Sequence, residues 1–192
     1  MFTCGWCGTS YPTWQSHCDS CGGPLPPPPG RDIGPEPPNP PRKLPIGFER
    51  RIRWTENVLV IIGAIFSVVG VIPVLLFTQV HHAGILVFAI FLVMGIAMFV
   101  SGWKKAAHTL RAFKHGRAVK GEITEVYLDT TETINNRHPW RISYKFDADG
   151  QMMDDYAKTW DASAALRSAG QPLWVLYVVN DPSQNTIYPP VR

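Results

Sequence analysis

Hydrophobic residues form two long uninterrupted runs near the middle of this 192-residue chain. From residue 58 to 80, and again from 83 to 103, no side chain is ionisable. At about 1.5 Å per residue, a helix of either length reaches across the roughly 30 Å hydrocarbon core of a bilayer. The pattern predicts two transmembrane helices, at about 57–80 and 83–103, joined by a short connection as an antiparallel hairpin.

A period of two, typical of β-strands, follows in the C-terminal part. Between Trp140 and Phe146 every second residue is apolar, which gives a strand one buried and one wet face. Asp149-Gly150 then predicts a tight hairpin turn. The expected order is β, β, β, short α, β, β, over the segments 119–128, 140–146, 151–160, 161–166, 173–179 and about 186–188. We therefore expect a small mainly-β domain at 110–192, either a curled sheet or a partial barrel with one short helix.

The four cysteines of the chain all lie near its start, as Cys4-x2-Cys7 and Cys18-x2-Cys21. Two such pairs on a short connection can surround a tetrahedral Zn²⁺ with four thiolates at about 2.3 Å. We predict a zinc site in a ribbon over residues 1–23, with iron as the alternative metal. A glycine follows each pair, which suits a backbone knuckle that needs a positive φ.

Two other interpretations of the cysteines fit less well. A disulfide framework needs an exported domain, and we expect no signal region because three residues precede Cys4. A dithiol redox centre would place one Cys-x-x-Cys at a helix start after a strand, and no βαβ pattern surrounds these pairs.

Proline dominates the segment that follows the cysteines, up to Pro45. Because proline lacks an amide donor and fixes φ, we expect an extended spacer that lets the ribbon move independently of the membrane anchor. Taken together, the zones predict a multi-domain membrane protein with a zinc ribbon at 1–23, a Pro-rich and basic juxtamembrane linker at 24–56, two transmembrane helices within 57–104 and a β-rich domain at 110–192.

Basic residues flank the two apolar runs, and none lies between the runs. They are Arg42, Lys43, Arg50, Arg51 and Arg53 on one side and Lys104, Lys105, Arg111, Lys114 and Arg117 on the other. The positive-inside rule places both termini in the cytoplasm, with Trp54 and Trp103 at the headgroup layer. A reducing cytoplasm would keep the thiols free to bind metal.

The predicted spans carry almost no polar side chains, which favours a lipid-embedded anchor over a transporter. Gly63, Ser67 and Gly70 share one face of the first helix, and Gly95 and Gly102 recur at heptad spacing in the second. Small residues at these positions permit close helix contact, either within the hairpin or between copies in a homo-oligomer.

The ribbon is rich in large rings and poor in positive charge. Residues 1–30 contain no Lys or Arg, so we expect no nucleic-acid binding, although the whole chain has a net charge of +3. Trp6, Tyr11 and Trp14 are too many rings for so small a core, and we expect them to bind an unknown protein partner. The alternative is that these rings cap the core of the ribbon itself.

Motifs in the C-terminal part resemble a known family. They are Gly121-Glu122-Ile123, Tyr144-Lys145-Phe146, Gly170-x3-Trp174-Val175-x-Tyr177 and Asp181-Pro182. Over residues 110–190 they resemble the domain of unknown function 3592, common in bacterial membrane proteins, and the N-terminus resembles a short zinc ribbon. The resemblance implies a multi-pass protein of the bacterial cytoplasmic (inner) membrane, and it carries no catalytic residues.

No motif of a known catalytic site is present, and a site made of four cysteines leaves no open metal position. We therefore expect no enzymatic activity. The sequence favours a membrane-anchored zinc-ribbon adaptor or assembly protein with two cytoplasmic interaction modules. The alternatives are a metal- or redox-responsive membrane regulator and an accessory subunit of a membrane enzyme.

Overall fold

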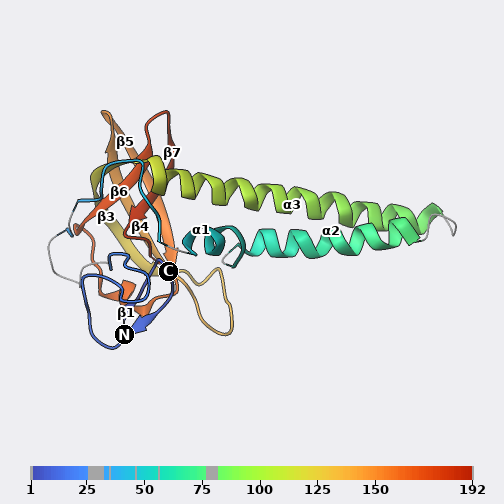
Figure 1. The fold of residues 1–192 in the computed structure, drawn as a ribbon, viewed down its shortest axis with the longest axis horizontal. Helices are drawn as coiled ribbons and strands as arrows, with labels where there is room; N and C mark the ends of the chain where they lie inside the picture. Colours follow the sequence, from blue (N-terminus) through green and yellow to red (C-terminus); the bar gives the residue numbers. More distant parts are fainter. Residues whose placement is uncertain are drawn as a thin grey trace. The chain divides into compact units, whose positions relative to one another are not determined.

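The computed structural model describes residues 2–25, 33–34, 36–45, 47–55, 57–76 and 82–191. The chain divides into two compact units (Figure 1). We call residues 1–48 together with 111–192 the cysteine–sheet unit, and residues 49–110 the helical unit.

Four helical segments run through the middle of the chain. They are α1 (Phe48–Arg50), the π-helical turn η1 (Arg51–Thr55), α2 (Val58–Leu76) and α3 (His82–His115). Asn57 caps α2, because its side-chain and backbone oxygens both accept from the Val60 amide. Between α2 and α3, residues 77–81 of the predicted connection lie outside the described residues.

Helix α3 is longer at both ends than the predicted span of 83–103. It begins at His82, one residue before the predicted span, and continues to His115. Beyond Trp103 the helix continues because the sequence keeps strong helix formers and an apolar stripe that includes Ala106 and Leu110, both buried. The charges after residue 103 end the apolar run, but they do not end the helix.

The described residues contain one helix that is by itself long and apolar enough to cross a membrane. It is the segment Leu86–His115 of α3, whose apolar window has a mean hydropathy of 2.4. The predicted first span is not matched in the same way. Residues 58–72 pass the same test only together with 48–55, from which they are bent by 55°. The helical turn η1 ends at Thr55, and α2 begins at Val58.

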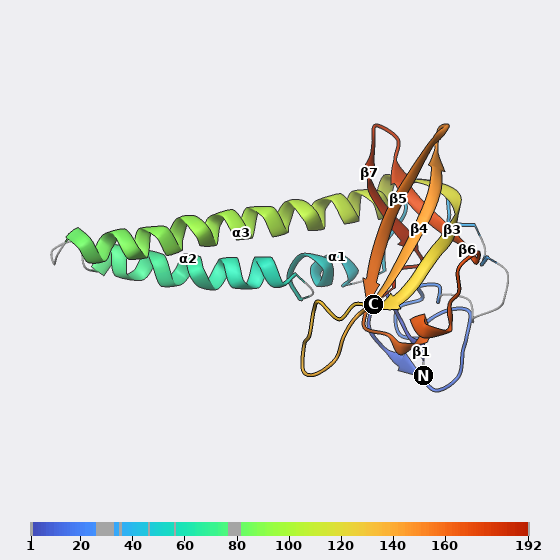
Figure 2. The same cartoon turned by 180° about the vertical axis from the view of Figure 1, so that it is seen from behind.

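Helices α2 and α3 pack against each other through small residues, as their spacing predicts. A methyl group on Gly63 would lie 2.5 Å from the Phe99 amide nitrogen, and one on Gly95 would lie 2.5 Å from the Ser67 nitrogen. The Asn57 amide donates to the Gly102 carbonyl at 2.7 Å. The contacts pair early positions of α2 with late positions of α3, so the helices are antiparallel (Figure 2).

The cysteine–sheet unit contains a five-stranded antiparallel sheet in the order β5-β4-β3-β6-β7. Its strands are β3 (Arg117–Leu128), β4 (Trp140–Ala148), β5 (Gln151–Thr159), β6 (Pro172–Val178) and β7 (Asp181–Tyr188). The short helix is η2 (Ala162–Leu166), a 3-10 helix that Asp161 caps by accepting from the Ser163 amide. The predicted order of elements is confirmed.

The hairpin turn agrees with the sequence prediction, whereas the start of the last strand differs from it. Asp149 and Gly150 have φ values of 55° and 91°, so both adopt the positive φ that a tight hairpin turn requires. The last strand was expected at about 186–188, but β7 begins earlier, at Asp181-Pro182. Strand β7 can start with proline because it lies at the edge of the sheet.

The sheet is curled until its two edge strands approach each other. Asn185 of β7 donates to the Asp155 carboxylate of β5 at 2.8 Å, and the Tyr144 hydroxyl donates to Asn185 at 2.6 Å. The nearly closed sheet encloses the core. The buried core residues are Ile123, Ile142, Tyr144, Phe146, Ala148, Ala164, Leu173, Val175, Tyr177 and Ile187.

The Pro-rich linker is not a free spacer where the structure describes it. The Trp174 indole donates to the Gly34 carbonyl at 2.8 Å, and Pro37 and Arg42 are buried. Extended proline-rich backbone keeps its carbonyls available as acceptors, so it can be held by an aromatic side chain that donates a hydrogen bond. The described residues of the Pro-rich segment, up to Pro45, therefore belong to the cysteine–sheet unit.

Candidate metal centre

The four cysteines lie on two knuckles with the same backbone geometry. In each knuckle the glycine amide four residues after the first cysteine donates to the carbonyl of that cysteine, at 2.8 Å from Gly8 and 2.7 Å from Gly22. Both glycines have positive φ, 86° and 69°, as the sequence predicts. The two-stranded pair β1 (Phe2–Thr3) and β2 (Ser10–Tyr11) flanks the first knuckle.

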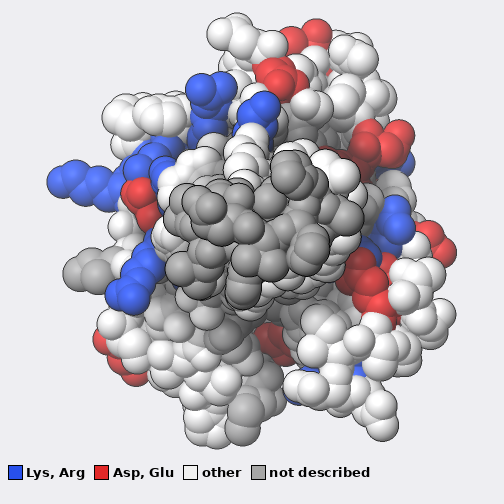
Figure 3. All heavy atoms as spheres, turned by 90° about the vertical axis from the view of Figure 1, so that its right-hand side faces the viewer, with Lys and Arg blue, Asp and Glu red and all other residues white. Residues whose placement is uncertain are grey.

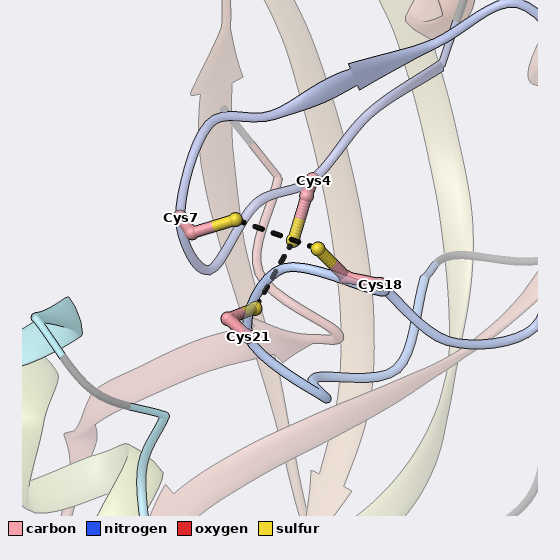
Figure 4. Close-up of side chains that lie close together, drawn as sticks. All are labelled: Cys4, Cys7, Cys18 and Cys21. Atoms are coloured by element: carbon pink, nitrogen blue, oxygen red, sulfur yellow. Dashed lines mark hydrogen bonds between the residues drawn. The ribbon is translucent and has the colours of Figure 1, made fainter.

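The knuckles bring all four sulfur atoms together (Figure 4). The Sγ atoms of Cys4, Cys7, Cys18 and Cys21 lie within 4.8 Å of one another. The Cys4–Cys21 and Cys7–Cys18 sulfur pairs are separated by 3.7 and 3.5 Å. Sulfurs at about 2.3 Å from a tetrahedral zinc would be about 3.8 Å apart. The residues thus fit a group that can hold one metal ion, and no cysteine forms a disulfide.

Two hydroxyl groups contact the sulfurs. The Tyr11 hydroxyl lies 3.2 Å from Cys18 Sγ and 3.4 Å from Ser20 Oγ. The Thr9 hydroxyl lies 3.2 Å from Cys7 Sγ. Such contacts around the ligands orient them and spread the charge of the thiolates.

The cysteine side chains do not ionise equally. Burial opposes ionisation of Cys18, but hydrogen bonds from the Tyr11 hydroxyl and from the Cys21 amide outweigh it and lower the pKa of Cys18 to about 6. Burial, together with contacts to the other cysteines, raises the pKa of Cys21. Burial also raises the pKa of Cys4. The first thiolate forms easily, whereas four thiolates at this separation require a cation among them.

Trp6, between the ligands Cys4 and Cys7, is buried rather than available to a partner. Its side chain is 3% exposed. Its ring centroid lies 4.7 Å from that of Phe48, 5.6 Å from that of Phe113 and 5.9 Å from that of Tyr188. We call these four residues the Trp6 cluster. The expectation that Trp6 is a partner-binding residue is therefore wrong, because distant parts of the chain cover the ring.

The other two rings proposed for partner binding are half-buried. Tyr11 is directed at Cys18 through its hydroxyl. Trp14, in the connection between the knuckles, is neither buried nor fully exposed. Partner binding at both residues stays a prediction.

Both knuckles make close contacts through glycine. The Trp6 indole donates to the Pro24 carbonyl at 2.9 Å. A methyl group on Gly23 would lie 2.4 Å from the Trp6 ring, and one on Gly5 would lie 1.8 Å from the Pro190 carbonyl oxygen. Only glycine leaves room for these contacts, so in both knuckles the backbone itself packs against neighbouring residues.

Arg42 fixes the end of α3 beside the same cluster. Its guanidinium donates to the Gly116 and Phe113 carbonyls at 2.6 and 3.4 Å, and its amide donates to the Lys114 carbonyl at 2.8 Å. These carbonyls lie at the helix end, where the helix offers no amides to pair them. Burial lowers the pKa of Arg42, although an arginine remains charged near neutrality.

The metal ligands could be found from spacing, but the supporting residues could not. Phe48, Phe113 and Tyr188 lie far from the cysteines in sequence, and none stands in a recognisable motif. Near the hairpin turn, the Asp149 carboxylate has two partners. Asp149 pairs with Arg117 at 2.6 Å, and it accepts from a buried tyrosine of β6.

No family model matches the chain, and neither the curated proteins nor the solved structures give a match. The resemblances to the domain of unknown function 3592 and to short zinc ribbons stay predictions.

Proposed function

We propose that the protein is a membrane-anchored adaptor or assembly protein that binds one Zn²⁺ through Cys4, Cys7, Cys18 and Cys21. Both apolar helices would cross the bacterial cytoplasmic membrane, and the cysteine–sheet unit would lie in the cytoplasm. The observation that carries the proposal is the presence, in one chain, of a four-cysteine group and of a helix apolar enough to span a membrane.

Lipid contact is supported by the side chains that the helices leave uncovered. Only 11% of the apolar window of α3 is buried. Leu86, Ile90 and Val93 of this helix are each more than 60% exposed. Similar side chains are exposed on α2, including Ile65 and Val68. Large apolar surface of this kind is stable in hydrocarbon and costly in water.

Zinc is favoured over iron because the group serves a structural purpose. Four-cysteine sites closed by protein ligands are typical of structural zinc, and such sites contribute directly to folding. The tetra-cysteine centre leaves no ligand position for a catalytic water, so the proposal assigns the protein no reaction of its own.

A protein partner is favoured by side chains on the outer face of the sheet. Arg141 lies between two tyrosines, with its guanidinium carbon 3.7 Å from the centre of the Tyr156 ring and 5.9 Å from that of Tyr127. Both tyrosines are exposed. Tyrosine and arginine are enriched at protein interfaces.

Charge on the surface gives no support to nucleic-acid binding. In the described part of the face shown in Figure 3, Lys and Arg are interspersed with Asp and Glu, and they form no continuous basic surface. The ribbon itself contains no Lys or Arg. Nucleic-acid binding normally requires several clustered Lys and Arg residues to neutralise phosphates.

Crosslinking in intact cells tests the adaptor function. A photoreactive amino acid at Tyr156, followed by purification in detergent, should capture one recurrent protein. Capture that is lost in Arg141→Ala and retained in Lys104→Ala would support a specific partner. A membrane enzyme as the captured protein would favour the accessory-subunit alternative, and capture of copies of this chain alone would favour a homo-oligomer.

Thiol labelling tests the topology separately. His82→Cys should react with a membrane-impermeant maleimide added outside spheroplasts, whereas the four native cysteines should stay unlabelled until the membrane is opened. Labelling of native cysteines from outside would overturn the cytoplasmic placement.

A metal-responsive regulator is the second candidate. It is favoured by the position of Trp6, which lies between two ligands and also inside an aromatic cluster built from distant segments.

A further inference from the structure

The first knuckle is the part of the ribbon that contacts the rest of its unit most closely. Gly5 and Trp6 are the two residues between the ligands Cys4 and Cys7. Gly5 lies against the Pro190 backbone, and the Trp6 ring lies in the Trp6 cluster. A second contact comes from the adjoining strand, where the Thr3 amide donates to the Asp161 carboxylate at 3.3 Å.

The position of Gly5 and Trp6 depends on the ligands on either side of them. A knuckle of this size has little core of its own, so its shape without metal is not maintained by packing within the ribbon. Structural zinc sites of this type typically order the chain around them when the metal binds. The shape that fits against Phe113 and Pro190 is therefore the shape that holds the four sulfurs together.

We propose that the tetra-cysteine centre is a metal-controlled latch, in which metal binding and docking of the first knuckle onto Phe48, Phe113 and Tyr188 are thermodynamically coupled. This inference rests on the proposed metal site and adds its regulation. Loss of the metal releases Trp6 from its cluster and loosens the segments that held it.

Those segments are the ones that connect the two units along the chain. Phe48 is followed directly by Glu49, the first residue of the helical unit, and Phe113 comes three residues after Leu110, its last residue. The centroids of the Phe48 and Phe113 rings lie 5.1 Å apart, and both rings also pack against Trp6. Both connections are therefore held by one ring that belongs to the metal centre.

Coupling is reciprocal, which gives the latch a quantitative test. If metal strengthens docking by a certain factor, docking strengthens metal binding by the same factor. Damage to the docking surface, away from every ligand, must then weaken the binding of metal. A ribbon that binds metal as an independent module would show no such effect.

Two variants damage the docking and leave the ligands intact. Gly5→Ala places a methyl group against the Pro190 carbonyl oxygen, and Gly5 is not among the positive-φ glycines, so the backbone itself tolerates alanine. Phe113→Ala removes one of the rings that pack against Trp6. The matched controls are Thr13→Ala, at an exposed position between the knuckles, and Tyr156→Ala, on the outer face of the sheet.

Zinc affinity is measured on the full-length protein in detergent micelles, by competition with a chromophoric chelator of known affinity. Gly5→Ala and Phe113→Ala should each weaken Zn²⁺ binding about 10-fold, within the 5- to 150-fold range usual for coupled sites. The two controls should stay within about twofold of the unchanged protein. Hydrogen exchange at residues 112–116 should quicken when zinc is removed from the unchanged protein.

The outcomes separate the latch from the metal site itself. Unchanged zinc affinity in Gly5→Ala overturns the latch, whatever the result for Phe113→Ala. The Phe113→Ala result does not decide alone, because general damage to the cysteine–sheet unit can weaken zinc binding indirectly. Exchange at residues 112–116 that does not respond to zinc also overturns it. Failure of the unchanged protein to bind zinc at all overturns the proposed metal site instead.

Discussion

Among the aromatic clusters of the described residues, two contain tryptophan and place it in opposite surroundings. In the cysteine–sheet unit, the Trp6 cluster buries its tryptophan to 3% exposure. In the helical unit, the Trp54 cluster contains Trp54, Phe99 and Trp103, with Trp54 45% exposed. Ring separations are similar, at 4.7–5.9 Å in the first cluster and 5.7–6.1 Å in the second.

The two clusters also differ in the polar groups that accompany them. The buried Trp6 indole donates to the carbonyl of Pro24, directly after the ribbon, as a buried donor requires. The Trp54 cluster instead has a charge beside it, because the Arg53 guanidinium carbon lies 5.1 Å from the centre of the Trp103 ring. The first arrangement is that of a protein core, and the second suits the headgroup layer proposed for it.

Loss of the metal should give the largest difference between the two clusters. Cys18→Ser removes one ligand, and apparent binding free energies of structural zinc are about 10–16 kcal/mol, so stoichiometric metal binding should be lost. With 5-fluorotryptophan incorporated, the ¹⁹F resonance of Trp6 should move and broaden, whereas that of Trp54 should not change. Ser20→Ala is the matched control and should keep the metal. A Trp6 resonance that is unaffected in Cys18→Ser would mean that the cluster does not depend on the metal.

Truncation of each tryptophan should give the next largest difference. Trp6→Ala empties a buried site and should cost about 3–5 kcal/mol in the free energy of unfolding of the cysteine–sheet unit. Trp54→Ala removes a largely exposed ring and should cost about 0.5 kcal/mol or less in detergent. Denaturant unfolding followed by far-ultraviolet circular dichroism measures both. Equal losses in the two variants would contradict the assignment of Trp6 to a core.

Short-range patterns explain why so much of the fold could be predicted from the sequence. Strand β4 follows from period-two alternation, and the Asp149-Gly150 turn follows from residues that accept positive φ. The metal ligands follow from a spacing of two residues within each pair. In each case the residues that carry the signal are neighbours in sequence, and the backbone geometry is local.

The misplaced features depend on contacts between distant segments. Trp6 looked exposed because a ribbon alone cannot bury it, but its cover comes from Phe48, Phe113 and Tyr188. The linker was expected to be free because proline cannot join a helix or a sheet, but Trp174 donates a hydrogen bond to it at Gly34, and Arg42 is buried. No pattern among neighbouring residues in the sequence predicts either contact.

Separation of the helices should disturb the Trp54 cluster alone. Gly63→Leu would drive a side chain into the backbone of α3 at Phe99, where even a methyl group would lie 2.5 Å from nitrogen. Overpacking of this kind costs about 1–3 kcal/mol. The loss should appear as earlier unfolding of the helices in dodecyl sulfate, with the ¹⁹F resonance of Trp6 unchanged. Ala97→Leu, at an exposed position of α3, is the control of equal bulk. Equal effects of the two leucines would argue against close packing of α2 on α3.

Removal of the charge beside Trp103 should have the smallest effect. Arg53→Met keeps much of the side-chain length and loses the cation, and exposed cation–π contacts are worth about 0.5–1 kcal/mol. The stability of the helical unit in detergent should fall by no more than this amount, and the ¹⁹F resonance of Trp103 should shift because its ring loses the adjacent charge. Arg50→Met, at an exposed position one turn earlier, removes the same charge and should leave the Trp103 resonance in place. If both variants move the Trp103 resonance equally, the ring responds to the overall charge of the segment and the Trp54 cluster has no specific cation.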